Sequence, residues 1–337
     1  MVRSLIVIVI LLSFVRCRKD PKLNGLPIND LGTYCFDESS HLAQEPILKE
    51  LYLGLVIGGP YYTILGPSFV YSLKFNPENA NQIIYVKSDS GATPLYKTIW
   101  FYDFCTKESR QIAAQSYNDL SWGSGDKILY TGLSHEVYMM NSWGEDVQQI
   151  TSSETYQHIG KFSPNGNFFF TTGSDGLRVF DINGNEIIFH EGYPPFKEID
   201  WIDNDHLLVM NNSTSIYQSF NIYTGDRINL HTQALCHYCN DTYVRSSHIV
   251  YFIDHRYDKT KGLYSFDLAK DQLTYLKELS SSYMYRSIDY NNDAKKLIFT
   301  LHEYSWKDSV KQEIYLRNSA IMLNENGTNP RILELPF

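Results

Sequence analysis

The side chains in this chain that could carry out chemistry are ten histidines and one pair of closely spaced cysteines. The histidines are scattered, and no H-E-x-x-H sequence, which would place two zinc ligands on one face of a helix, occurs. Cys236 and Cys239 form a C-x-x-C, but the sequence offers no second ligand pair at the spacing of a zinc site. Asn240 stands where a haem attachment needs histidine. A local disulfide, or two thiols in a loop, explains this pair better than a metal or redox site.

Motifs of nucleophilic and phosphate chemistry are also missing from the sequence. There is no G-x-S-x-G nucleophile elbow and no glycine-rich loop for a nucleotide. Asp181, Asn183 and Asn185 alternate as in a calcium loop, but the series stops after Gly184 and coincides with a hairpin turn. We therefore predict no catalytic residue, no metal and no cofactor. The formal net charge of −9 also argues against nucleic acid as a partner, because phosphate backbones need a basic surface.

Two repeated sequence signatures define the elements that would position any site. In the first, a strand closes with an aromatic residue before a turn and a second apolar run. In the second, a strand ends in Asp or Asn before a turn and another strand. The aromatic residues are Phe75, Trp122, Phe162, Trp201, Tyr243 and Tyr290, and the Asp and Asn anchors are Asp103, Asn141, Asp181, Asn221, Asp267 and Asn324.

Each repeat unit therefore holds four short strands joined by tight turns, in which Asn, Asp and Gly tolerate the left-handed backbone. Successive signature aromatics lie between 39 and 47 positions apart. Four-stranded units of about 40–45 residues are typical of β-propeller blades, whose radial packing covers sheet faces that one small sheet cannot bury alone. We predict an all-β fold in which residues 46–337 form a six-bladed β-propeller of four-stranded antiparallel blades.

The repeats also resemble a known family. VYMMNSWGEDVQQIT (137–151) and IMLNENGTNPRIL (321–333) are similar to the repeat element of TolB-like, or WD40-like, propellers, and KFSPNG (161–166) is similar to that family's WSPDG. The resemblance covers about residues 66–337. It implies a six-bladed propeller and a non-catalytic binding role in the cell envelope. It does not extend to TolB itself, because no separate α/β domain is expected before the blades.

The N-terminus resembles an export signal. The apolar run at 5–15 is too short to span a bilayer as a helix and has the length of a signal-peptide core. Cys17 follows, so residues 1–17 resemble a lipoprotein signal in which Cys17 is lipidated. We predict an exported protein of the periplasm or outer membrane, held to the membrane by this lipid. Plain secretion and an uncleaved anchor are the alternatives.

The remaining segments give less specific predictions. Residues 18–45 are expected to be an exposed lead-in, and residues 46–65 to be strands that either begin the propeller or help close the ring. An insertion at 305–312 predicts a long hairpin or loop in the last blade. Export permits disulfides, and the four cysteines after Cys17 allow three connectivities, which the sequence leaves open: Cys35, Cys105, Cys236 and Cys239.

The loops that lead into the first strand of each blade should emerge together on one face of the ring. Nearly all of them carry aromatic residues, followed by a few polar ones, which is the composition of recognition surfaces. Packing of the same rings between blades is the alternative, since the chain has 26 tyrosines. The predicted partner-binding residues are Tyr71, Tyr117, Tyr156, His158, Tyr193, Lys197, Tyr238, Tyr283 and Arg286.

The sequence thus favours a non-catalytic binding or scaffold protein that uses this tyrosine-rich face to hold an envelope protein or a glycan. The alternative is a polysaccharide lyase or glycosidase at the mouth of the propeller channel, with His158, Glu198 and Arg286 as candidate groups. A third hypothesis, a structural subunit of an envelope complex, predicts a dominant exposed apolar patch instead.

Overall fold

A computed structural model of the chain shows how the repeats are arranged. It describes the following residues: 34–35, 40–42, 52–58, 61–65, 69–88, 97–114, 116–133, 135–152, 157–192, 197–211, 216–230, 242–244, 248–254, 262–278, 283–308, 313–333 and 335.

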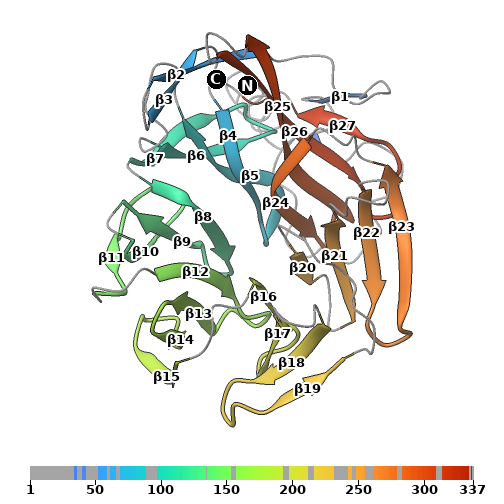
Figure 1. The fold of residues 1–337 in the computed structure, drawn as a ribbon. Coiled ribbons are helices and arrows are strands. Elements are labelled where there is room, and N and C mark those ends of the chain that lie inside the picture. The colour runs from blue at the N-terminus through green and yellow to red at the C-terminus, as the bar shows by residue number, and fades with distance from the viewer. Residues whose placement is uncertain are drawn as a thin grey trace, which may run out of the picture.

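The described strands form six blades around a central axis (Figure 1). In every blade four strands pair antiparallel in the order in which they occur along the chain, and this confirms the predicted fold class. Blade 1 contains β4 (Phe69–Asn76), β5 (Asn79–Ser88), β6 (Lys97–Asp103) and β7 (Ser109–Ala114); blade 2 contains β8 (Ser116–Gly123), β9 (Lys127–Gly132), β10 (Val137–Met140) and β11 (Gln148–Gln149); blade 3 contains β12 (Gln157–Phe162), β13 (Phe168–Gly173), β14 (Gly176–Asp181) and β15 (Glu186–Glu191).

The second half of the ring follows the same plan. Blade 4 contains β16 (Lys197–Trp201), β17 (His206–Asn211), β18 (Ile216–Asn221) and β19 (Arg227–Asn229); blade 5 contains β20 (Thr242–Val244), β21 (Ile249–Asp254), β22 (Gly262–Asp267) and β23 (Gln272–Glu278); blade 6 contains β24 (Tyr283–Asn291), β25 (Lys296–Asp308), β26 (Glu313–Asn324) and β27 (Arg331–Leu333). The first strands of successive blades contact one another, and β24 contacts β4, so the ring is closed.

The repeated Asp or Asn anchor has a local structural cause. Asn141 Oδ1 accepts hydrogen bonds from the backbone N–H groups of Trp143 and Glu145, both at 2.9 Å, and so closes the turn after β10. Four other anchors, Asp103, Asp181, Asn221 and Asp267, accept from backbone N–H groups of their own turns in a similar way. The turn ends with Gly144 at a φ of 81°, where a Cβ atom would lie 2.2 Å from the carbonyl oxygen of Ile112 in blade 1. Glycine is therefore required there by both backbone conformation and space.

The hydrophobic core is divided among the blade interfaces. Each of the six pairs of neighbouring blades has its own cluster of buried apolar side chains. In the cluster between blades 1 and 2, for example, Phe101 packs edge-on to Trp122, with ring centroids 6.1 Å apart. The blades are consequently held face to face by apolar burial, as radial packing requires.

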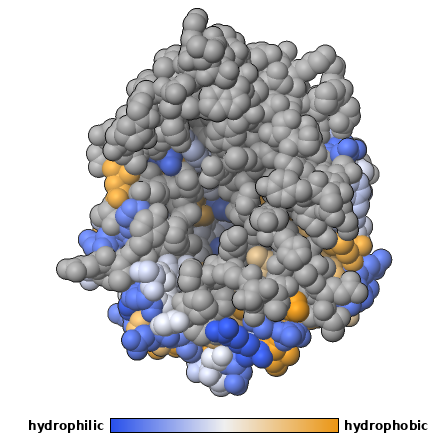
Figure 2. All heavy atoms as spheres, viewed as in Figure 1, coloured by the Kyte–Doolittle hydropathy of each residue, from blue (hydrophilic) through white to orange (hydrophobic). Residues whose placement is uncertain are grey.

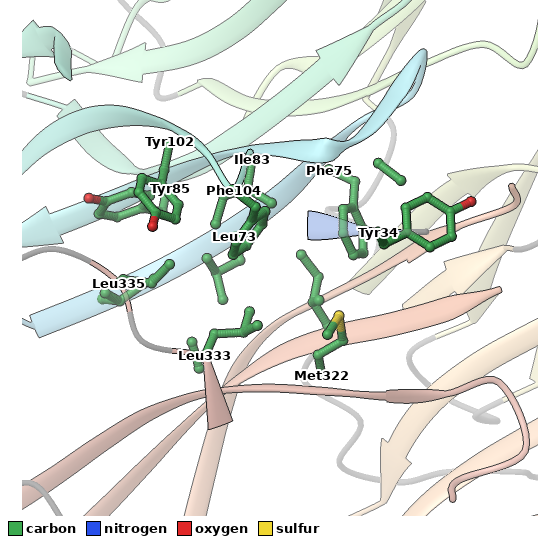
Figure 3. Close-up of a cluster of buried hydrophobic side chains, with 14 residues drawn as sticks. Tyr34, Leu73, Phe75, Ile83, Tyr85, Tyr102, Phe104, Met322, Leu333 and Leu335 are labelled. Carbon is green, nitrogen blue, oxygen red and sulfur yellow. The ribbon is translucent and has the colours of Figure 1, made fainter. Parts of the chain in front are cut away.

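The last interface, between blades 6 and 1, includes residues from before the first blade. Tyr34 is only 7% exposed and packs in this cluster with residues of both blades, such as Leu73 and Met322 (Figure 3). β1 (Ser40–Leu42) pairs with β27 and becomes the outermost strand of the last blade. Parts of the predicted lead-in 18–45 thus pack against the ring.

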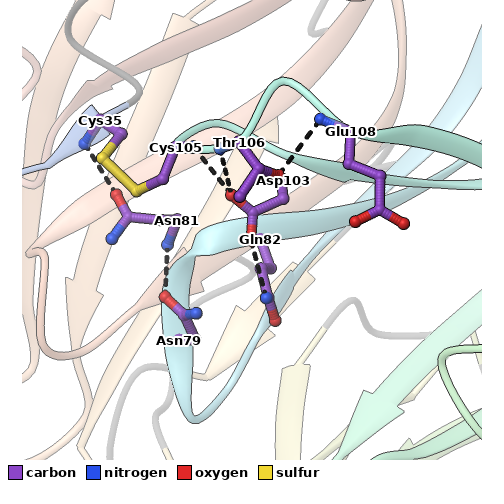
Figure 4. The surroundings of a disulfide bond; sticks show 8 residues. All are labelled: Cys35, Asn79, Asn81, Gln82, Asp103, Cys105, Thr106 and Glu108. Atoms are coloured by element: carbon purple, nitrogen blue, oxygen red, sulfur yellow. Dashed lines mark hydrogen bonds between the residues drawn. A yellow bond between two sulfur atoms is a disulfide. The ribbon is translucent and has the colours of Figure 1, made fainter. Parts of the chain in front are cut away.

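A disulfide joins the same segment to blade 1. Cys35 is bonded to Cys105 in the turn between β6 and β7, and the Cys35 backbone N–H donates to Asn81 Oδ1 at 2.8 Å (Figure 4). Of the three connectivities that the sequence left open, this bond selects one. Cys236 and Cys239 lie outside the described residues.

The described part of the 46–65 segment, residues 52–58 and 61–65, extends the last blade instead of beginning the first one. β2 (Tyr52–Gly58) and β3 (Tyr61–Leu65) form a hairpin, and β2 pairs with the first half of β26. The described part of the predicted insertion at 305–312 belongs to the long strand β25, whose pairing with β26 continues to Asp308 and Glu313. The extra length of this pair of strands provides the edge to which β2 adds. None of the described residues belongs to a helix long and apolar enough to cross a membrane.

Candidate functional site: the central cavity

The ring encloses a cavity of about 400 Å³ near its axis. The cavity lies at the ends of the first strands of five blades and beside the turns that follow them. Its wall includes, from each of these strands, the signature aromatic residue and the residue before it. Those pairs are Lys74 and Phe75, Ser121 and Trp122, Lys161 and Phe162, Asp200 and Trp201, and Asp289 and Tyr290. In Figure 2 the molecule is hollowed at the centre of the ring, and described hydrophilic residues are visible inside the hollow.

Alternation along the strand explains why a polar residue stands next to each aromatic one. Successive side chains leave opposite faces of a strand, so the two residues of a pair contact different neighbours. The indole of Trp122 is 7% exposed and packs between blades 1 and 2, whereas Ser121 supplies a hydroxyl to the cavity wall. The packing of the aromatic residue thereby fixes the position of the residue before it.

An ion pair and a second ammonium group lie in this wall. The Lys161 ammonium forms an ion pair with the Asp200 carboxylate, which joins blades 3 and 4. The side chain of Asp200 is 7% exposed and that of Lys161 is 21% exposed, so the pair is largely shielded from water. On the other side of the ring, the Lys74 ammonium donates to the Ile288 carbonyl oxygen at 3.1 Å and thereby joins blades 1 and 6.

Asp289 is also buried, with 8% of its surface exposed. Its Oδ2 accepts a hydrogen bond from the Phe75 backbone N–H at 2.8 Å. Burial raises the pKa of the Asp289 carboxyl above its usual value of 3.8, and the Lys74 and Lys161 ammonium groups oppose that shift. The cavity wall therefore contains two ammonium groups and three carboxylates, since Asp203 also lines it.

Hydrogen bonds between neighbouring blades hold this wall in place. The Trp201 indole Nε1 donates to the Lys161 carbonyl oxygen at 2.7 Å. Trp122 occupies the equivalent position in blade 2, where it packs against blade 1. Its Nε1 is buried and has no hydrogen-bond partner among the described residues. The turns beyond the cavity are linked as well, since the Glu78 carboxylate accepts from the Gly125 backbone N–H at 2.7 Å. The geometry is that of a fixed polar pocket in a rigid frame.

The structure places one member of the predicted partner-binding face. Tyr71 is 9% exposed and packs in the core between blades 1 and 2, with the Lys97 ammonium 4.4 Å from its ring centroid. The side chains of the other eight predicted residues lie outside those that the structure describes, as does Cys17. Glu198, a candidate group of the enzyme hypothesis, lies outside them too.

Among the described residues, no group of three or more His, Cys, Asp and Glu side chains could hold a metal ion. The Asp181 turn, which alternates like a calcium loop, is closed by its own hydrogen bonds. Asp181 Oδ1 accepts from the backbone N–H groups of Asn183 and Asn185, both at 2.9 Å. This carboxylate therefore closes the hairpin of blade 3.

Sequence reasoning missed the charged residues of the cavity, although the signal was present. The residue before each signature aromatic reads Lys, Ser, Lys, Asp and Asp in blades 1, 2, 3, 4 and 6. Comparing the repeats position by position would have shown that this column is polar and differs from blade to blade. A polar column beside a constant aromatic one is unexpected for a position that serves packing alone.

The chain matches no model of a protein family and no curated protein sequence. Among solved structures it is similar to a TolB candidate from Agrobacterium tumefaciens, with 11% sequence identity, a TM-score of 0.52, and coverage of 70% of this chain and 88% of that chain. TolB from Acinetobacter baumannii aligns with 12% identity and a TM-score of 0.41, over 84% of this chain and 63% of that chain. The first similarity confirms the TolB-like propeller fold that the repeats predicted.

Proposed function

We propose that this chain is a non-catalytic binding propeller of the cell envelope, and that it holds a protein partner on the face formed by the loops leading into the first strands. The observation that carries this proposal is the extensive packing between neighbouring blades. Every pair of neighbouring blades shares a buried apolar cluster, and the pairs around the cavity are joined by further hydrogen bonds. A frame of this kind fixes the strands from which binding loops extend, which lowers the entropic cost of binding a partner.

The charges of the cavity also fit a binding role better than an acid–base role. Lys161 and Asp200 are paired with each other, and the Asp289 carboxylate is held by a backbone N–H. A general acid or base must be able to exchange its proton with a substrate, whereas these groups are engaged in joining blades. A TolB-like fold is compatible with this role but does not by itself establish it.

Export and anchoring form the second part of the proposal. The apolar run at 5–15 followed by Cys17 would direct the chain out of the cytoplasm and attach it to a membrane through a lipid. Labelling with a radioactive fatty acid tests this directly. The wild-type chain should incorporate the label and partition into detergent, and Cys17→Ala should do neither. A wild-type chain that carries no label would leave plain secretion as the better proposal.

The partner face is tested with a triple variant, Tyr117→Ala, Tyr156→Ala and Tyr193→Ala. The control replaces Tyr223 and Tyr275, which are 56% and 48% exposed in the outer parts of blades 4 and 5, by Ala. Proteins captured from the native envelope are identified, and the affinity of the purified partner is then measured for each variant. We expect the triple variant to weaken binding at least tenfold and the control to leave it unchanged.

The opposite pattern, in which only the outer-strand variant loses the partner, would contradict the assignment of the face. If a purified envelope glycan binds the wild type and no protein does, the partner in this proposal would be replaced by a glycan.

A further inference from the structure

The central cavity has a chemistry of its own, separate from the loops proposed above to hold a protein. Its wall is built at the ends of β4, β8, β12, β16 and β24, whereas those loops precede the starts of the same strands. We propose that this cavity is a second binding site, and that it takes a neutral, hydroxyl-rich ligand of monosaccharide or disaccharide size.

The volume and the wall are those of a small-molecule site. A cavity of about 400 Å³ lies within the range of small-ligand pockets, which combine apolar walls with a few fixed polar groups. Here the rings of Phe75, Phe162 and Tyr290 supply apolar wall, and Ser121 and Asn291 add a hydroxyl and an amide. A sugar presents both kinds of surface, because its C–H groups alternate with hydroxyls.

The charged groups of the wall already interact with protein partners, and this selects a neutral ligand over an ionic one. The Asp203 carboxylate, which also lines the cavity, accepts from the backbone N–H groups of Asp205 and His206. Lys161 and Asp200 form a shielded ion pair, and the Lys74 ammonium lies close enough to Asp289 to affect its titration. An anion or cation entering the cavity would have to disrupt such a pair or leave one of its charges unbalanced in a partly desolvated site, and both are costly. A neutral ligand leaves these interactions unchanged.

Hydroxyl groups also match the hydrogen-bonding capacity of these charged side chains. An ammonium group only donates and a carboxylate only accepts, whereas a hydroxyl does both. A polyol can therefore bond to Lys161 on one side and to Asp289 on the other with the same functional group. These polar atoms are already held by bonds between blades, such as that from the Phe75 N–H to Asp289, so binding need not order them.

The proposal is tested by calorimetric titration of the full chain with four probes. Maltose and glucose are neutral, and glucosamine and glucuronate are glucose analogues that add one positive or one negative charge. We expect at least one neutral sugar to bind and both charged analogues to bind at least tenfold more weakly. The proposal would be overturned if neither neutral sugar bound at concentrations up to tens of millimolar. Dissociation constants of that size correspond to binding free energies of about −2 to −3 kcal/mol. Tighter binding of either charged analogue would overturn it equally.

A substitution in the wall locates the site. Ser121→Lys places in blade 2 the residue that blades 1 and 3 carry at the equivalent position, so the strand should accept it. The added side chain would fill part of the cavity and bring a further ammonium group into it, and we expect at least a tenfold loss of sugar affinity. Gln111→Lys, at an exposed position of β7, adds the same charge outside the cavity and should change nothing.

Folding of both variants is checked by circular dichroism. If Ser121→Lys fails to fold, Asn292→Trp replaces it, because Asn292 lines the cavity from an exposed turn that tolerates substitution. A folded cavity variant that keeps the wild-type affinity would overturn the assignment of the site.

Discussion

The bond between Cys35 and Cys105 should contribute more to stability than any single packing contact in the ring. It connects the segment before the propeller to blade 1, while β1, in the same segment, pairs with β27 of blade 6. Tyr34 lies next to Cys35 and is buried between those two blades. The bond therefore fastens a segment that bridges the first and last blades, and its loss should weaken the closure of the whole ring.

The size of the effect follows from the length of chain between the two cysteines. A sequence separation of 70 residues corresponds, in the chain-entropy account of disulfides, to about 4 kcal/mol of stabilisation at 25 °C. Measured losses of native disulfides fall between about 2 and 5 kcal/mol. Cys105→Ser should accordingly lower the free energy of unfolding by about 2–4 kcal/mol.

The measurement is urea unfolding of oxidised and reduced protein, followed by tyrosine and tryptophan fluorescence. Reduction of the wild type should reproduce the effect of Cys105→Ser, and the double variant with Cys35→Ser should lose no more than either single variant. The control changes Cys236 and Cys239 to Ser and should retain the response to reduction. Equal stability of wild type and Cys105→Ser, or additive losses in the double variant, would refute the argument that the two cysteines act as one bond.

Three further predictions use matched positions in different blades or one group at different pH. Trp201→Phe should lower the free energy of unfolding by about 1 kcal/mol more than Trp122→Phe, because only the Trp201 indole donates a hydrogen bond, to the Lys161 carbonyl oxygen. Equal losses in urea unfolding would contradict this. Gly144→Ala should lower the free energy of unfolding by about 2 kcal/mol more than Gly125→Ala in the same assay. Both glycines have positive φ, but only at Gly144 would a Cβ atom meet a carbonyl oxygen. The reverse order would show that space is not limiting. The pKa of Asp289 in the folded state is raised above 3.8. At pH values between 3.8 and that raised pKa, the folded protein therefore binds more protons than the unfolded chain. The stability of the wild type relative to Asp289→Asn should therefore fall as pH rises through that window and stay level above it, and a difference independent of pH would contradict the assignment.

Much of the fold could be predicted from the sequence because each signature corresponds to a local physical cause. The anchor residue Asn141 closes a turn with its own side chain, and Trp122 fills an interface between blades. Such causes act within one unit or between neighbours, so they recur with the repeat and can be recognised in it. The number of blades and the order of their strands follow from counting these units.

The closure of the ring could not be predicted in the same way. It depends on pairings between segments far apart in the sequence, such as β1 with β27 and β2 with β26, and a three-residue strand such as Ser40–Leu42 carries almost no pattern of its own. The disulfide partner of Cys35 was likewise one of three possibilities that only the spatial position of Cys105 could separate.

The cavity residues illustrate a different limit, which concerns the meaning of a repeat. The aromatic position is constant because every blade must fill the same interface, so it records packing. The position before it faces the cavity, which five of the blades share, and its residues differ from blade to blade instead of repeating. Lys161 of blade 3 forms an ion pair with Asp200 of blade 4. The pair exists because the two blades carry different residues at the same position of the repeat. In a propeller the search for a site should therefore begin at the column where the repeats differ while the frame around it stays the same.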